Sequence, residues 1–228
     1  MIYTLKWSIM IKYHGFGGVK MTKGRFIVLE GLDGSGKGTQ ADLLIAEMKR
    51  QGRKVCLTAE PTSSSTGGML RDALGGFVSR DAYELSAMFL LDRIFHNVNP
   101  KNGIRQYIES GVDVVCDRYY YSSFAYQGID ADLKWVMDMN LNCREILKPD
   151  LCIFLDVSPE DGEKRISGSR LDREIYENTQ AQKRIRNRFF EVFELLKDSE
   201  NIKIVDASRT VPEVSADIIK LYNQLKEN

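Results

Sequence analysis

The sequence is poor in the residues that build metal centres, because its 228 residues include two histidines and four cysteines. No two cysteines have the C-x-x-C spacing of a zinc or redox pair, so neither kind of site is expected. Cys56, Cys116 and Cys152 lie in apolar stretches and are predicted to be small buried side chains. Unpaired thiols are typical of a reducing compartment, which indicates the cytoplasm.

Neither sign of charge is in excess, since 32 lysines and arginines balance 32 aspartates and glutamates. A general nucleic-acid or membrane-surface binder carries a basic excess, so neither partner is expected. No apolar stretch reaches the roughly 18 residues that a membrane-spanning helix needs. A small anionic ligand is still compatible with this charge balance, because a few clustered arginines can bind one.

Residues 1–20 differ from the rest of the chain. Scattered charges interrupt any apolar core there, so a signal peptide is not expected. The segment is predicted to be a disordered N-terminal extension, as chain ends commonly are, with an extra strand or a partner contact as the other interpretation. Residues 21–228 have an ordinary globular composition and the length of one domain.

From residue 25 onward, short apolar runs alternate with longer amphipathic stretches. The runs cover residues 25–30, 54–58, 112–116, 151–155 and 202–205. Their nearly continuous hydrophobicity predicts strands covered on both faces, as in a parallel sheet. Helices are predicted after Gly36 and over residues 81–97, 133–147, 175–197 and 211–225, the last with Thr210 as N-cap. The alternation predicts an α/β fold with a five-stranded parallel sheet and helices on both faces.

The first apolar run leads into a glycine-rich loop, Gly31-Leu32-Asp33-Gly34-Ser35-Gly36-Lys37-Gly38-Thr39. In this G-x-x-x-x-G-K pattern, glycines allow backbone N–H groups to converge on an anion, and the helix start adds a positive dipole end. Lys37 can reach the outer phosphates of a nucleotide. The position between a strand and a helix favours binding of a nucleoside triphosphate over a turn without a ligand. Gly38 stands where a Mg²⁺-binding hydroxyl is usual, so that hydroxyl is missing or comes from Thr39.

Arginines recur near the predicted strand ends, where open α/β sheets bind their ligands. Arg118 follows the third run directly after Asp117. Asp117 is predicted to help hold Mg²⁺, directly or through water, or else to be a strand-end cap or an ion-pair partner. Phe89 and Arg93 lie four residues apart on one helix face. They suit base stacking with edge recognition, or a core ring beside an arginine that pairs with Asp117 or with Asp92.

Three further segments carry polar side chains. Residues 117–130 combine tyrosines, hydroxyls and an amide, and suit a base pocket or a tyrosine-rich core. Glu60 ends the second run and leads into residues 62–68, a Ser/Thr/Gly stretch that is predicted to be flexible. Residues 164–174 place basic side chains around a Gly-Ser break. They form a solvated loop or, above a phosphate-binding loop, a lid that brings arginines onto the phosphates.

From residue 21 to its end, the sequence resembles the thymidylate kinases, a family of P-loop nucleoside-monophosphate kinases. The motifs that carry the resemblance are Glu30-Gly-Leu-Asp-Gly-Ser-Gly-Lys37, Glu60-Pro61, Phe89-Leu-Leu-Asp-Arg93, Asp117-Arg-Tyr119, Ser122-Ser-Phe-Ala-Tyr-Gln-Gly128, Lys148-Pro-Asp-Leu151, Leu155-Asp-Val157, Asp172-Arg173 and Val205-Asp-Ala207. The resemblance implies the P-loop NTPase fold, with a small lid at about residues 164–175 inside one domain, 21–228.

The resemblance also implies roles for individual residues. The glycine-rich loop with Lys37 would hold the phosphates of ATP. The residues implied to bind dTMP are Asp33 at the sugar, Arg71 and Arg118 at the phosphate, Phe89 stacked on thymine, Arg93 and Gln127 at its edge, Tyr126 against the 2′ position, and Ser123. Gly34 replaces the basic residue of some family members, so the catalytic arginine would come from the lid, as Arg165 or Arg170, and act with Lys37 and Arg118.

The implied reaction is ATP + dTMP → ADP + dTDP, with Mg²⁺ as cofactor, in dTTP synthesis by a homodimer. An ionised phosphate acceptor needs no general base. Three other functions stay open: a deoxynucleoside kinase with Glu60 as general base, an adenylate-kinase-like enzyme that acts on AMP, and a nucleotide-binding protein without turnover, which Gly38 favours.

Overall fold

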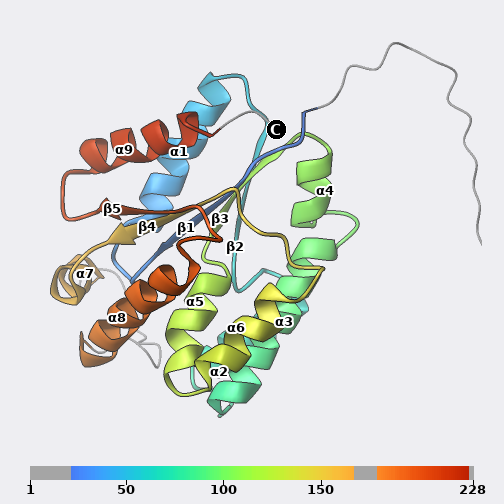
Figure 1. Ribbon diagram of the computed structural model, residues 1–228, viewed down its shortest axis with the longest axis vertical. Helices are drawn as coiled ribbons and strands as arrows, with labels where there is room; N and C mark the ends of the chain where they lie inside the picture. The colour runs from blue at the N-terminus through green and yellow to red at the C-terminus, as the bar shows by residue number, and fades with distance from the viewer. Residues whose placement is uncertain (1–21, 167–178, 226–228) are drawn as a thin grey trace, which may run out of the picture.

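The computed structural model describes residues 22–166 and 179–225. The predicted N-terminal extension and most of the predicted lid, including Arg170, therefore lie outside the described residues. The described residues contain a five-stranded parallel sheet with helices on both faces (Figure 1). The strands, in the order in which they pair, are β2 (Val55–Ala59), β3 (Asp113–Asp117), β1 (Phe26–Gly31), β4 (Leu151–Asp156) and β5 (Ile202–Asp206). The α/β fold predicted from the sequence is confirmed.

The central strand β1 contributes side chains to two hydrophobic cores, because successive side chains of a strand point to opposite faces of the sheet. Phe26 and Val28 pack in one core with α5 (Tyr120–Tyr126) and α8 (Thr179–Leu196). Ile27 and Leu29 pack in the other core with α1 (Lys37–Arg50) and α9 (Val211–Asn223). Figure 1 shows α1 beside α9 on one side of the sheet and α5 beside α8 on the other. The edge strands β2 and β5 are half-exposed, so full burial on both faces belongs to the three inner strands alone.

The remaining helices connect the strands. They are α2 (Ser65–Leu74), α3 (Ala82–Val98), α4 (Ile104–Glu109), the 3₁₀ turn η1 (Gln127–Ile129), α6 (Leu133–Leu141) and α7 (Pro159–Ile166). Asp81 caps α3, and Glu213 accepts a hydrogen bond from the backbone N–H of Thr210 (3.0 Å), which confirms the predicted start of α9. Within the described ranges, no helix combines the length and the hydropathy that a membrane span requires.

One predicted helix is shorter in the structure. The helix expected over residues 133–147 ends at Leu141, because Leu147 is held elsewhere: its N–H donates to Asn97 Oδ1 (3.0 Å) and its carbonyl accepts from the hydroxyl of Tyr119 (3.0 Å). Pro149, two residues after Leu147, further disfavours a helix in this segment. The helix expected from residue 175 is described from Thr179 onward.

The stretch 62–68 is not the flexible segment that its composition predicts. It folds against α3 and forms the N-terminus of α2, with Ser64 as N-cap. The buried carboxylate of Asp92 accepts hydrogen bonds from the Thr62 N–H (2.7 Å), the Thr62 hydroxyl (2.6 Å) and the Thr66 hydroxyl (2.6 Å). Small hydroxyl side chains, which weaken secondary structure on their own, are here tied to one acceptor on a neighbouring helix.

Candidate active site

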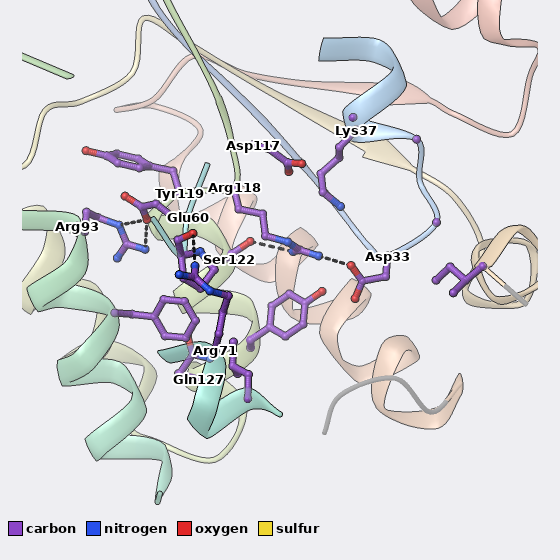
Figure 2. A pocket seen from close by; sticks show the side chains of 18 of the residues that line it. Asp33, Lys37, Glu60, Arg71, Arg93, Asp117, Arg118, Tyr119, Ser122 and Gln127 are labelled. Carbon is purple, nitrogen blue, oxygen red and sulfur yellow. Dashed lines mark hydrogen bonds and ion pairs between the residues drawn. The ribbon is translucent and has the colours of Figure 1, made fainter. Parts of the chain in front are cut away.

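A pocket of ≈ 530 Å³ lies at the carboxyl ends of β1, β2 and β3, the usual ligand position in an open α/β sheet (Figure 2). The predicted site residues that line it are Asp33, Gly34, Gly36, Lys37, Gly38, Thr39, Arg71, Phe89, Arg93, Asp117, Arg118, Tyr126, Gln127 and Arg165. Gly31, Leu32, Ser35 and Ser123 are not among the lining residues. The glycine-rich loop and the helix face with Phe89 thus meet in one cavity, although they lie far apart in the sequence.

The glycine-rich loop ends at the start of α1. Gly36 precedes the helix with a φ of 93°, a left-handed conformation that suits glycine. No side chain of the described residues caps α1. The N–H groups of its first turn therefore have the arrangement that binds anions.

Lys37 lies inside this loop with its side chain buried. Its Nζ donates hydrogen bonds to the carbonyl oxygens of Gly31 (3.0 Å) and Leu32 (2.9 Å). Burial, with a smaller contribution from the positive charge of Arg118, lowers the pKa of Lys37 to about 8. The ammonium is therefore charged at neutral pH and close to its titration range.

The loop contacts α7 backbone to backbone at Gly34. Gly34 has a φ of 76°, and a Cβ atom there would lie 2.2 Å from the carbonyl oxygen of Gly162. A basic side chain has no room at this position while α7 lies against the loop. Gly38 differs, because a Cβ atom there would meet no atom within 4 Å.

Arg118 lies in the middle of the pocket between Asp33 and Ser122 (Figure 2). Its Nη2 donates to Asp33 Oδ1 (2.6 Å), and its Nη1 donates to Ser122 Oγ (3.2 Å). The guanidinium carbon is 5.2 Å from the centre of the Tyr126 ring. The backbone of Arg118 has a φ of 67°, which is uncommon for a residue other than glycine.

Arg93 is 1% exposed and holds the other end of the pocket. Its Nε donates to Glu60 Oε2 (2.8 Å), its Nη1 to Asn140 Oδ1 (2.6 Å) and its Nη2 to Ser123 Oγ (3.1 Å). The alternative in which Arg93 pairs with one of two aspartates is wrong, because Glu60 is its ionic partner. Ser123 therefore reaches the site through Arg93.

Both carboxylate oxygens of Glu60 are engaged. Oε2 accepts from Arg93, and Oε1 lies 3.0 Å from Nδ1 of His96. A carboxylate held in this way is poorly placed to act as a general base, which counts against the deoxynucleoside kinase alternative.

The remaining predicted residues line the pocket between these ends. Phe89 is half-buried and faces the cavity rather than the core. Arg71 lies on α2 and donates from Nη1 to the carbonyl oxygen of Thr62 (2.6 Å). Gln127 is buried, and its Oε1 has no hydrogen-bond partner in the described part of the chain. An unpaired acceptor aimed at a cavity is a group that a ligand can satisfy.

The tyrosine-rich segment, residues 117–130, was predicted to form either a base pocket or part of the core, and its tyrosines do both. Tyr120 and Tyr121 are buried in the core, and their hydroxyls donate to Glu200. Tyr126 lines the pocket.

The pocket suits a Mg²⁺ ion that is bound together with a phosphate ligand. One oxygen of Asp117, Oδ1, is buried without a hydrogen-bond partner among the residues of the described ranges. The same ranges hold no group of three or more His, Cys, Asp or Glu that would bind an ion alone. Mg²⁺ commonly takes one or two carboxylates plus substrate phosphates and water, so Asp117 fits such an ion, with Thr39 at the pocket wall.

Several functional side chains were not identified from the sequence. Glu30 is fully buried at the end of β1 and accepts from Ser122, the hydroxyl that also contacts Arg118. A carboxylate at the end of an apolar run was the signal that could have marked it. Asn140, on α6, carried no such signal.

The comparisons with known proteins identify the family. Residues 29–218 match the model of the thymidylate kinase family. The chain is 34% identical over 212 residues to a probable thymidylate kinase of Thermococcus gammatolerans, covering 88% of this chain and 97% of that protein. It is 37% identical over 205 residues to one of Pyrococcus abyssi, covering 87% and 96%.

The fold is also similar to that of a solved thymidylate kinase from Candida albicans. The TM-score is 0.76 at 23% identity, with 89% of this chain and 92% of that chain covered. Together, the family model and the relatives show that this chain belongs to the thymidylate kinase family.

Proposed function

We propose that the protein transfers the γ-phosphoryl group of ATP to the phosphate of dTMP, which yields ADP and dTDP for dTTP synthesis. The observation that carries the proposal is one cavity with two kinds of wall. One wall is the phosphate-binding loop with Lys37, and the other combines the Phe89 ring with the donors and acceptors of Arg93 and Gln127. Arg118 lies between them, where the two phosphates would meet.

The acceptor site recognises a base, a sugar and a phosphate in turn. Phe89 stacks on thymine, while Arg93 and Gln127 contact its edge. Because Glu60, Asn140 and Ser123 accept hydrogen bonds from three N–H groups of Arg93, and Glu60 is also its ionic partner, this arginine is rigid and presents few free N–H groups.

The sugar and phosphate lie nearer to the loop. Asp33 faces the 3′-hydroxyl, and Tyr126 excludes a 2′-hydroxyl. Arg71 and Arg118 bind the phosphate, because a planar guanidinium group can donate two parallel hydrogen bonds to two oxygens of one phosphate.

The donor site is the loop from Gly31 to Thr39 with Lys37. Asp117 would hold Mg²⁺, directly or through water, and Thr39 would supply the hydroxyl that Gly38 lacks. The ion would supply positive charge that neutralises the phosphates of ATP. Lys37 neutralises further charge on these phosphates.

Catalysis then consists of alignment and charge neutralisation. The acceptor is already ionised near neutral pH, because the second pKa of a phosphate monoester is about 6. Lys37 and Arg118 act on the transferred group together with a lid arginine, Arg165 or Arg170. Arg165 donates to the carbonyl oxygens of Gly34 (3.4 Å) and Ala207 (3.0 Å), next to the loop.

We expect Lys37→Ala and Arg118→Ala each to reduce kcat/KM by several orders of magnitude, in line with the roughly 10³–10⁵-fold effect of an arginine finger. Turnover close to that of the unsubstituted protein in either variant would refute the role of that residue.

The proposed reaction is tested by ADP release with dTMP, dUMP, dCMP, AMP and thymidine as acceptors. Preference for dTMP supports it. Preference for AMP indicates an adenylate-kinase-like enzyme, preference for thymidine a nucleoside kinase, and ATP binding without transfer to any acceptor a non-catalytic protein.

The protein is also proposed to be a homodimer that works in the cytoplasm. Leu91, Phe95 and Val98 form an exposed apolar stripe on α3 (54%, 40% and 39% exposed), which a second copy would cover. All four cysteines are free thiols, as expected in a reducing compartment. Light scattering tests this by measuring the molar mass of the protein and of the Phe95→Glu variant. We expect the mass of a dimer for the unsubstituted protein and that of a monomer for the variant. A monomer mass for the unsubstituted protein contradicts the proposed dimer.

A further inference from the structure

Glu30 places a carboxylate beneath the pocket, at the end of β1. Its side chain is 0% exposed. Oε1 accepts from the backbone N–H of Tyr119 (2.8 Å) and of Ser122 (3.1 Å), and Oε2 accepts from the Ser122 hydroxyl (2.7 Å). A buried carboxylate with this many partners is fixed in one orientation.

These donors belong to the start of α5. Tyr119 is the N-cap residue of this helix and provides no side-chain cap of its own. Glu30, 92 residues before Ser122, supplies the missing cap from another element. A negative charge at a helix N-terminus also interacts favourably with the helix dipole.

The hydrogen bond from the Tyr119 N–H to Glu30 also fixes the backbone of Arg118, the residue directly before Tyr119. The φ of 67° at Arg118 persists only where surrounding contacts determine it. Two consecutive N–H groups are held by the end of β1: Arg118 N–H donates to Leu29 O (2.9 Å), and Tyr119 N–H donates to Glu30. Without the second contact, the turn loses one of its two anchors.

Glu30 also directs the guanidinium of Arg118. The Ser122 hydroxyl has one proton and donates it to Glu30, so its oxygen is left as an acceptor for Nη1 of Arg118. The opposite end of the guanidinium donates to Asp33. The orientation of Arg118 is therefore set by a chain of contacts that begins at Glu30.

We propose that Glu30 is a positioning residue for the acceptor phosphate, because it fixes both the backbone turn and the guanidinium direction of Arg118. The inference rests on the proposed function, in which Arg118 binds the phosphate of dTMP. Glu30 itself touches neither substrate.

The charge of Glu30 gives this proposal a test with a definite sign. A negative charge beneath the pocket opposes phosphate binding through space. If charge were its main effect, Glu30→Gln would tighten dTMP binding; if positioning dominates, the same substitution weakens it. The two effects predict opposite changes.

The experiment compares Glu30→Gln and Ser122→Ala with the control Tyr121→Phe. The control removes buried hydrogen bonds of the same helix away from Arg118, since the Tyr121 hydroxyl donates to Glu200 Oε2 (2.9 Å) and accepts from the Tyr120 hydroxyl (3.5 Å). Steady-state kinetics give KM for dTMP and for ATP, titration calorimetry gives dTMP affinity without turnover, and thermal unfolding reports stability.

In Glu30→Gln, KM and Kd for dTMP should rise about tenfold, as expected for loss of a charge-assisted hydrogen bond, while KM for ATP stays within about twofold. Ser122→Ala keeps the carboxylate and the two backbone bonds, so a smaller rise in KM for dTMP is expected. Tyr121→Phe should lower the melting temperature without changing either KM.

An unchanged or lower KM for dTMP in Glu30→Gln overturns the proposal, and so does an equal rise for both substrates. If Glu30→Gln does not fold, Ser122→Ala decides: no rise in KM for dTMP overturns the proposal. An unsubstituted protein that neither binds nor phosphorylates dTMP contradicts the proposed function, and this inference with it.

Discussion

The contact between the phosphate-binding loop and α7 can be tested with Gly34→Ala. The substitution adds one methyl group at a φ of 76°, where the new Cβ would lie 2.2 Å from the carbonyl oxygen of Gly162 and 2.8 Å from its carbonyl carbon and Cα. These neighbours are backbone atoms, so no side-chain rotation relieves the overlap. Either α7 or the loop has to move.

The magnitude follows from two costs. A left-handed conformation costs an L-residue about 1–2 kcal/mol, and overpacking of a tight contact costs about 1–3 kcal/mol. We therefore expect the free energy of unfolding to fall by roughly 2–5 kcal/mol. In a chain of this size, that corresponds to a decrease in melting temperature of roughly 4–20 °C.

The matched control is Gly38→Ala, in the same loop and with the same added methyl group. A Cβ atom at Gly38 meets nothing within 4 Å, and the residue lies in the first turn of α1. Alanine there should be neutral or stabilising by up to about 1 kcal/mol.

Thermal unfolding and KM for ATP are measured for both variants. Gly34→Ala should melt lower and bind ATP more weakly, because displacement of the loop disturbs the phosphate-binding N–H groups. Equal melting temperatures and equal KM values for the two variants would refute the close contact with α7.

Three further predictions concern single side chains. Burial lowers the pKa of Lys37 to about 8, and only the charged ammonium attracts phosphate, so kcat/KM for ATP should fall about tenfold per pH unit above pH 8. Lys37→Arg should lack this decline. A flat profile to pH 10 in the unsubstituted protein contradicts the phosphate-binding role of Lys37. Asp92→Ala releases the hydroxyls of Thr62 and Thr66 and should raise KM for dTMP about tenfold through Arg71, so an unchanged KM contradicts the anchoring of α2. Asp113→Ala, at the opposite end of the sheet, removes the hydrogen-bond acceptor of Arg53 (2.6 Å), of the Arg25 N–H (2.7 Å) and of the Tyr222 hydroxyl (3.1 Å). Urea unfolding should show that the free energy of unfolding falls by about 2–4 kcal/mol, while the KM values stay unchanged. An unchanged free energy of unfolding would show that these contacts do not stabilise the fold.

The fold was predictable because its signals are local. Each of the five apolar runs became a strand within one residue of its expected bounds, and the glycine-rich loop marked the end of the first. The error at residues 142–147 has a distant cause, since Asn97 and Tyr119 hold Leu147 outside a helix. Helical periodicity carries no information about such partners.

The candidate site was predictable in its residue types and less so in their partners. The sequence left two roles open for Arg93: base recognition, or an ion pair with Asp92 or Asp117. The structure pairs it with Glu60, 33 residues away, while Asp92 faces the other way and holds Thr62. Residues adjacent on a helix project in different directions, so proximity in sequence was a poor guide to ionic partners. The link from Glu30 to Ser122 crosses 92 residues and depends on the packing of β1 against α5.

The position of Lys37 has a consequence for the catalytic cycle. An ammonium group has three donors, and two of them already close the loop by bonding to the carbonyl oxygens of Gly31 and Leu32. The third is left for the nucleotide, so the two contacts that shape the loop do not depend on a bound nucleotide. In the proposed reaction, ATP would therefore enter a preformed site, and binding would not carry the entropic cost of ordering this segment.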